Sequence, residues 1–227
     1  MNTAFWTTPS RQAAIHPSSS EERTRLSSFV DILTEPIKRI TVEAGQKLLY
    51  IVPVLLSLPE RRHREIVLAG EGAEVDIIGL FLGRGDDVLN LKLDTTHAAP
   101  NTRGRTEFKA VLAGKSSLEF NGMIKILKNA QNSNDFLQQD SLLLSADAKA
   151  KAIPGLEIEA NEVKASHGAT AKPVDPAQKF YLMSRGLSEA QAEAMIVQGF
   201  VTAILSKLDI IWQTRIIDVM KNKFSLV

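Results

Sequence analysis

Hydrophobic and polar residues alternate over most of the middle of the chain, from Ile37 to about Ala165. The stretches 89–93 and 118–126 show the pattern most clearly. A period of two places successive side chains on opposite faces of a strand, so we expect strands with one buried face. No helical period appears between them, and the separating pieces are rich in glycine or polar residues, as in 70–72 and 83–86.

Many short strands could form a sandwich, a barrel or a coiled stack, and periodicity does not separate these folds. The spacing between comparable strands is irregular, and no Asn-Gly or Asp-Gly turn separates two of them. Such turns dominate two-residue hairpins. The sequence therefore favours stacking over a meander.

Different patterns flank the strands. Residues 1–19 are predicted to form an arm. The stretch Ser20–Leu33, with an acidic first turn and helical apolar spacing, predicts a short amphipathic helix. Beyond Pro173 the pattern becomes helical, with a capping box at Ser188. We therefore expect an N-terminal arm and helix (1–35), a β core (36–173) and a helical domain (174–227).

The composition excludes several classes of protein. The 227 residues include 27 basic and 26 acidic side chains, for a formal net charge of +1. This balance lacks the basic field that drives binding to nucleic acid. The longest apolar run, Leu48–Leu58, is too short to span a bilayer and contains Pro53. We expect a cytoplasmic protein that binds neither nucleic acid nor membrane.

Cysteine is absent from the sequence. Disulfides, thiolate catalysis and the usual ligands of iron–sulfur clusters are excluded together. Any metal ligand of this chain would be an imidazole or a carboxylate. No phosphate-binding loop of the Walker type is complete either, so any ATP would be hydrolysed by another protein.

Several ordered motifs run from about His97 to Phe200. They are His97-x-x-Pro100-Asn101-Thr102-Arg103, Phe120-x-Gly122-x-Ile124, Gln139-x-x-x-Leu143-Leu144, Pro154-x-Leu156-Glu157-Ile158, His167-Gly168-Ala169-Thr170 and Phe180-Tyr181-Leu182-Met183-Ser184-Arg185-Gly186. This series resembles the SufB/SufD family of iron–sulfur cluster assembly proteins. The resemblance implies a right-handed parallel β-helix followed by a C-terminal helical domain.

The resemblance also implies a function. Members of this family are assembly scaffolds without enzymatic activity of their own. The chain would pair through its β-helix with a SufB-type or identical subunit, and would dock a SufC-type ATPase through its C-terminal helices. An iron–sulfur cluster would be held only transiently, at the shared interface.

His167 is the candidate cluster or metal ligand that the resemblance implies. The alternative is a structural histidine, because strand alternation puts it on the same side as Val163 and Ala165. SufB-type chains have acidic residues on both sides of this histidine and an upstream cysteine, whereas this chain has Ser166, Gly168 and no cysteine. These departures make it similar to a short SufD, although residues 195–200 are more similar to SufB.

The other motif residues divide into two groups. The partner-binding candidates are Tyr181, Arg185, Phe200, Ile204 and Trp212. The residues predicted to have structural roles are His97, Pro100, Gly168, Thr170 and Gly186.

An enzyme built on a β-helix is the alternative function, acting on carbohydrate or acyl substrates. Such an enzyme needs convergent carboxylates or a positioned histidine. Glu157 and Glu159 are the one carboxylate pair along a strand, and we expect both to face solvent. Typical SufD proteins resemble this chain only over their C-terminal half, which leaves the identity of the partner open.

Overall fold

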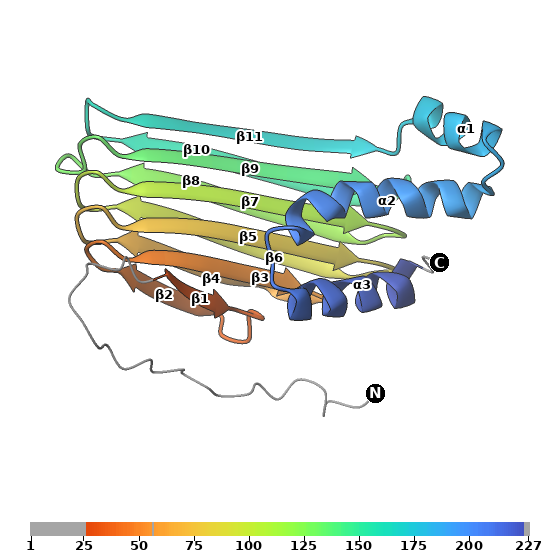
Figure 1. Cartoon of the computed structure of the whole chain (residues 1–227), viewed down its shortest axis with the longest axis horizontal. Helices are drawn as coiled ribbons and strands as arrows, with labels where there is room; N and C mark the ends of the chain where they lie inside the picture. The colour runs from red at the N-terminus through yellow and green to blue at the C-terminus, as the bar shows by residue number, and fades with distance from the viewer. Residues whose placement is uncertain (1–25, 56, 225–227) are drawn as a thin grey trace.

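The computed structural model describes residues 26–55 and 57–224. Within these two ranges, eleven strands precede three helices, and Figure 1 shows their arrangement. The strands are β1 (Leu26–Val30), β2 (Ile37–Val42), β3 (Lys47–Val54), β4 (Leu58–Leu68), β5 (Glu74–Gly83), β6 (Val88–His97), β7 (Arg103–Leu112), β8 (Ser117–Ile126), β9 (Asn134–Leu143), β10 (Lys149–Ile158) and β11 (Lys164–Pro173). The helices are α1 (Pro176–Ser184), α2 (Glu189–Leu205) and α3 (Ile210–Phe224).

The strands form a flattened parallel coil. Odd-numbered strands make a six-stranded sheet, here called sheet A, and even-numbered strands make a five-stranded sheet, sheet B. Every strand pairing is parallel; for example, Val75 pairs with Gly104, and Gly104 pairs with Asp135. One turn of the coil, or rung, therefore takes about 30 residues. The predicted parallel coil with C-terminal helices is confirmed, and no hairpin joins the strands of either sheet.

Left-handed residues shape the turns that lead into sheet A. Gly72, Asn101 and Asn132 have φ values of 68°, 59° and 59°, and each lies two residues before a strand. Glycine and asparagine are the residues that adopt this conformation at least cost. The turns also stack, because the Asn101 amide donates to the carbonyl of Gln131 one rung further on, at 2.9 Å. Local sequence thus sets the same bend in successive rungs.

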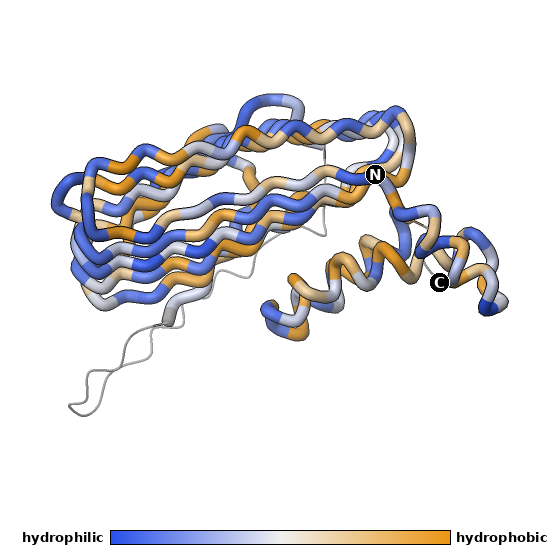
Figure 2. The backbone as a smooth tube through the Cα atoms, turned by 90° about the horizontal axis from the view of Figure 1, so that it is seen from above, coloured by the Kyte–Doolittle hydropathy of each residue, from blue (hydrophilic) through white to orange (hydrophobic). Residues whose placement is uncertain are grey.

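The interior of the coil is apolar, as the alternation predicts. Hydrophobic and hydrophilic residues alternate along its strands (Figure 2). Leu89, Leu91 and Leu93 are at most 1% exposed. The residues between them, Asn90 and Lys92, are partly exposed. Phe108 and Phe120 meet across the interior with ring centroids 4.8 Å apart. Large side chains from both sheets therefore fill one shared core.

A buried ion pair holds the loop between β1 and β2 near the N-terminal end of the coil. The Arg64 guanidinium, with no exposed surface, donates from Nε to Asp31 Oδ2 at 2.6 Å and from Nη2 to the Glu35 carbonyl at 2.9 Å. Tyr50 donates to the same carboxylate oxygen at 2.5 Å, and the amide of Leu33 donates to the other oxygen at 2.7 Å. These bonds fold the 31–36 loop across the first rung.

The predicted N-terminal helix is wrong for its described part. Leu26–Val30 form strand β1, which pairs in parallel with β3; residues 20–25 lie outside the described residues. Phe29 stacks on Tyr50 at 5.9 Å, and Val30 packs on the apolar outer face of sheet A. Pairing with a neighbouring strand therefore overrides the local helical spacing.

Helices α2 and α3 pack against the outer face of sheet A (Figure 1). This second core joins Ile78 and Leu80 of β5 to Val201 and Ile204 of α2, among other residues. The Lys109 ammonium also donates to the Phe200 carbonyl at 2.9 Å. The predicted capping box of Ser188 and Gln191 begins α2. By contrast, α1 buries none of its residues.

Acid should weaken the contacts that hold the 31–36 loop. Burial pushes the pKa of Asp31 upward, but hydrogen bonds from Arg64, Tyr50 and Leu33 outweigh burial and hold it below its usual value. The carboxylate therefore stabilises the fold above its unfolded pKa of about 4, and this contribution is lost as pH falls through the lower folded pKa. We expect Asp31→Asn to lower the free energy of unfolding by about 3–5 kcal/mol at pH 7, because Arg64 would be buried unpaired.

Urea unfolding at pH 7 and pH 3 measures this effect. The difference between wild type and Asp31→Asn should shrink at pH 3. Asp86→Asn, in an exposed turn, is the matched control and should change little at either pH. An equal loss of unfolding free energy for Asp31→Asn and Asp86→Asn at pH 7 would contradict the role assigned to Asp31.

Candidate functional site at the open end of the coil

The C-terminal end of the coil is open. In the described chain, β10 pairs with β8 and β11 with β9, and each has a free second edge. Leu156 and Ile158 of β10 are 39% and 43% exposed, although their register partners Ile124 and Ile126 are buried. Inward side chains of the last rung are therefore accessible because no further rung covers them.

His167 lies at this open end, on β11. It is in register with Leu137, which is 1% exposed and part of the interior. The imidazole therefore occupies an inward position on its strand, yet His167 is exposed. The alternation predicted the side of the strand correctly, while the position on the last rung makes the ring accessible.

The residues after His167 serve the outer face of sheet A. A side chain at Gly168 would meet Gln138, since a Cβ there would lie 2.4 Å from its Oε1. The Thr170 hydroxyl donates to Asp140 at 2.6 Å, and Gln138 donates to the same carboxylate oxygen at 2.7 Å. The His-Gly-Ala-Thr motif thus places an imidazole on one side of β11 and fastens the other side to β9.

His97 belongs to a buried polar cluster in the turns beneath the open end. Its Nε2 lies 2.9 Å from Asp135 Oδ2 and its Nδ1 lies 2.7 Å from Thr102 Oγ1. Thr102 donates to the Ala99 carbonyl at 3.1 Å and shares a hydrogen bond of 2.7 Å with Ser133. Neither His97 nor Asp135 has an exposed side chain, so this cluster ties successive rungs together.

Two neighbours of this cluster support it: Pro100 with a backbone hydrogen bond, and Gly104 by having no side chain. The Pro100 carbonyl accepts from the Gly72 amide at 3.3 Å. Gly104 leaves room for the Asp135 carboxylate, because a Cβ there would lie 2.4 Å from Oδ2. Sequence reasoning missed Asp135 and Ser133. The repeat of Asn101-Thr102 as Asn132-Ser133, one rung later, is the signal that could have found them.

The five partner-binding candidates differ in accessibility. Tyr181 of α1 is 56% exposed, and the exposed Arg185 lies over its ring at 5.2 Å. Phe200 and Trp212 are half-buried against the second core. Ile204 has no exposed surface. Only the first two therefore present most of their surface to solvent, and Gly186, with φ of 96°, ends α1 directly after Arg185.

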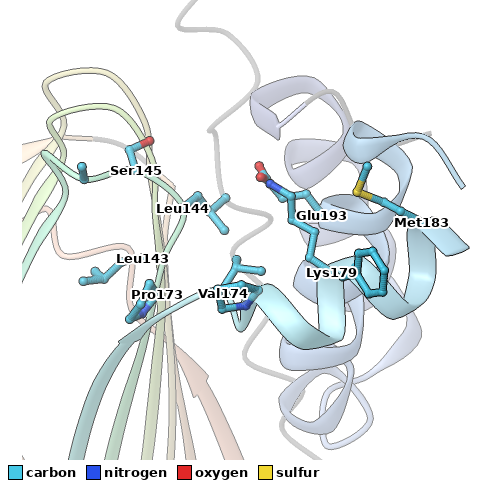
Figure 3. Close-up of a pocket in the computed structure, with 11 residues that line it drawn as sticks. Leu143, Leu144, Ser145, Pro173, Val174, Lys179, Met183 and Glu193 are labelled. Atoms are coloured by element: carbon cyan, nitrogen blue, oxygen red, sulfur yellow. The ribbon is translucent and has the colours of Figure 1, made fainter.

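A groove separates α1 from the end of the last rung (Figure 3). Its volume is about 580 Å³. Leu143, Pro173 and Val174 line the side of the coil, and Phe180 and Met183 line the helix. Lys179 and Glu193 add one charge of each sign. This groove lies beside the open end and is largely apolar.

The site has a limited set of chemical groups. Among the residues that the structure describes, no three His, Cys, Asp or Glu side chains gather as a metal site. Glu157 faces solvent, as expected, and pairs with Lys125 at 2.6 Å. None of the described helices has the length and hydrophobicity needed to cross a bilayer. The chemical group that distinguishes the site is the exposed imidazole of His167 at the open end of the coil.

The architecture is thus a parallel coil that ends in an open rung, with helices folded back on one sheet. Residues 37–200 match the family model described as SUF system FeS cluster assembly, SufBD core domain. The chain belongs to this SufBD family.

Curated relatives are consistent with this assignment. An iron-sulfur cluster assembly SufBD family protein of Mycobacterium tuberculosis is 30% identical over 75% of this chain and 20% of its own length. The iron-sulfur cluster assembly protein SufD of Bacillus subtilis is 33% identical over 63% of this chain and 33% of its own length. A SufBD family protein of Synechocystis is 28% identical over 65% of this chain and 31% of its own length. The chain thus spans about a fifth to a third of the length of these relatives.

The space beside Gly104 provides a test of the buried cluster. Gly104→Ala should displace the Asp135 carboxylate and lower the free energy of unfolding by about 1–3 kcal/mol. Gly199→Ala is the control, because nothing lies within 4 Å of its Cβ position and alanine favours a helix. Denaturant unfolding should show a lower free energy of unfolding for Gly104→Ala and no decrease for Gly199→Ala. Equal stabilities for Gly104→Ala and wild type would contradict the packing.

Proposed function

We propose that this chain is a SufD-like scaffold subunit for the assembly of iron–sulfur clusters. It pairs with a SufB-type or identical subunit through the open end of the coil, and it docks a SufC-type ATPase through the C-terminal helices. The exposed imidazole of His167 at that open end is the observation that carries the proposal. Membership of the SufBD family supplies the context of iron–sulfur assembly.

The C-terminal end of the coil, which holds His167, suits pairing with another subunit. Leu156 and Ile158 are accessible there, beside the free edges of β10 and β11. Free edges are ready templates for another strand, and proteins usually cover them. A partner subunit would bury both the edges and the apolar side chains.

The chemistry of His167 suits a contributory role. A neutral imidazole nitrogen is a competent ligand for iron. Because the chain has no cysteine, sulfide or thiolate ligands must come from the partner or from the cluster itself. The cluster is therefore cargo, held between subunits and passed on. In this proposal the chain supplies shape and one nitrogen ligand, and it catalyses no reaction alone.

The packing of the helices supports coupling to an ATPase. Helix α1 exposes Phe180, Tyr181 and Met183, which suits a docking surface. The Lys109 bond to α2 and the Lys223 ammonium bond to the Leu82 carbonyl, at 2.9 Å, fasten the helices to sheet A. An ATPase docked on α1 would act on the coil through α2, to which the Lys179–Glu189 ion pair joins α1. Nucleotide binding could then favour one arrangement of the paired coils by differential affinity.

Replacing the imidazole tests its role in holding the cluster. We expect His167→Ala, coexpressed without oxygen with SufB-type and SufC-type proteins, to copurify in the complex but to lose most of its cluster absorbance. His63→Ala is the control, because that imidazole lies on the outer face of sheet B, 2.9 Å from Asp94. Full cluster content in His167→Ala would refute a ligand role, and loss of the complex would assign the residue to the interface.

Changes on α1 test the docking surface. The paired change Tyr181→Ala with Arg185→Ala should reduce retention of the SufC-type ATPase at least about tenfold in pull-down titrations, because exposed aromatic and arginine side chains dominate interfaces. Phe136→Ala on β9, 37% exposed, removes an aromatic ring elsewhere on the surface and should leave binding unchanged. Undiminished binding by the α1 variant would exclude this surface.

A further inference from the structure

The N-terminal end of the coil carries an open groove on its first rung. Within the described ranges, β1 pairs only with β3 and β2 pairs only with β4, so the outer edges of both strands are free. The groove, of about 350 Å³, is lined by side chains of both strands, among them Ser27, Phe29 and Ile40, and by Leu48 of β3. It lies at the opposite end of the coil from His167.

The groove exposes inward positions of the first rung. Phe29 is in register with Tyr50, and Ile40 is in register with Ile66; neither partner has any exposed surface. Phe29 itself is 38% exposed, and Ile40 is partly exposed. Ser27, at the next inward position of β1, is small and exposed. A further rung would therefore bury apolar surface here, and it would find room above Ser27.

The free edge of β1 presents main-chain groups to a further strand. The amide of Asp31 donates to the carbonyl of Ile51 on β3, at 2.8 Å. Main-chain groups point alternately to the two sides along a strand, so those of Ser28 and Val30 face the free edge. These groups suit a parallel neighbour, as in every strand pair of sheet A.

The sequence upstream of β1 contains a segment typical of a strand. Residues 1–25 lie outside the described residues, and residues 3–8 among them read Thr-Ala-Phe-Trp-Thr-Thr. Aromatic and β-branched residues are enriched in strands. Leu26 pairs with Lys47, so paired residues of β1 and β3 are 21 positions apart. The same separation upstream places residues 5–9 beside β1.

We propose that residues 5–9 form a further parallel strand on the free edge of β1, with the Trp6 ring in the groove above Ser27. The inference goes beyond the proposed function, because it concerns the other end of the coil. The connection is long enough for this pairing. A five-residue strand spans about 17 Å, whereas residues 10–25 span up to about 50 Å when extended, so they reach from the end of this strand back to Leu26.

Side-chain size agrees with this register. Trp6 is paired with Ser27, so the largest side chain of the segment lies over a small one. Ile40 and Leu48 line the groove around this position and supply apolar contacts. The indole would thus fill the space that the first rung leaves open.

The neighbouring inward position suits a polar residue. The register pairs Thr8 with Phe29, whose ring centroid lies 4.5 Å from Lys38 Nζ. The ammonium also donates to Glu35 at 3.4 Å. A threonine leaves this cation in place over the ring, whereas a shift of two residues, which would put Trp6 over Phe29, would displace it. The contacts of Lys38 therefore favour Trp6 above Ser27.

The backbone of the added strand also fits. In this register the amides of Ser28 and Val30 donate to the carbonyls of Trp6 and Thr8. Pro9 is paired with Val30, but its nitrogen faces away from β1, where no N–H group is needed. Proline on an outer strand hinders the addition of another strand. The free edge of β1 would thus be covered from within the chain.

Tryptophan fluorescence tests the burial of the indole. Trp212→Phe leaves Trp6 as the one tryptophan, since the sequence has two. We expect Trp6 to emit at a shorter wavelength in the folded chain than in urea, and to be quenched less by acrylamide, because its ring is removed from water. A solvent-exposed Trp6 would overturn the proposal and leave the groove to another protein. A shift on dilution would also overturn it, by assigning the segment to a second copy.

Two proline variants test the pairing. Thr8→Pro removes the N–H that donates to the Ser28 carbonyl, whereas Thr7→Pro removes one that faces outward. In the Trp212→Phe chain, Thr8→Pro should shift the emission of Trp6 to that of an exposed ring. Thr7→Pro is the matched control and should leave the emission unchanged. Equal effects of the two prolines would overturn the register.

Hydrogen exchange gives a second readout that keeps Trp212. The amides of Ser28 and Val30 should exchange at least about tenfold faster in Thr8→Pro than in the wild-type chain, because they lose their acceptors. The amide of Asp31, which is bonded to Ile51 on β3, is the internal control and should keep its rate. Unchanged rates at Ser28 and Val30 would overturn the added strand.

Discussion

Backbone hydrogen bonding between successive rungs is the constraint on which the molecule depends. Each strand needs a neighbour at both edges, and a coil satisfies this requirement everywhere except at its two ends. At the N-terminal end, the outer edges of β1 and β2 are free in the described chain, and the Arg64–Asp31 pair holds the loop between these strands. The C-terminal end has the free edges of β10 and β11 and an accessible interior. His167 on β11 locates the candidate site at this second end.

The rest of the structure stiffens this end and connects it to the helices. Beneath the last rung, the buried cluster of His97, Thr102 and Asp135 joins turns that are far apart in the chain. The second core then fixes α2 and α3 to sheet A. The interior of the coil is filled by apolar side chains and its turns are joined by hydrogen bonds between rungs. His167 lies on the last strand of this coil, and α1 follows that strand directly in the chain.

Prediction from the sequence succeeded where a local pattern sufficed. Alternation at 89–93 identified an inward face, and it placed His167 on the inward side of its strand. It failed at 26–30, where helical spacing was present but pairing with β3 decided the conformation. Among the partner-binding candidates, Ile204 was named from its apolar position, yet it lies fully inside the second core. An apolar stripe does not reveal what covers it.

The sequence by itself determined the period of the strands, the left-handed turn residues and the absence of any thiol ligand, because each depends on residue type and local geometry alone. Tertiary structure decided why Arg64 is buried with Asp31, why His97 is buried with Asp135, and why His167 is accessible although it points inward. These outcomes depend on whether another rung lies above a residue. That neighbour comes from a distant part of the chain or from another subunit, so local spacing does not encode it.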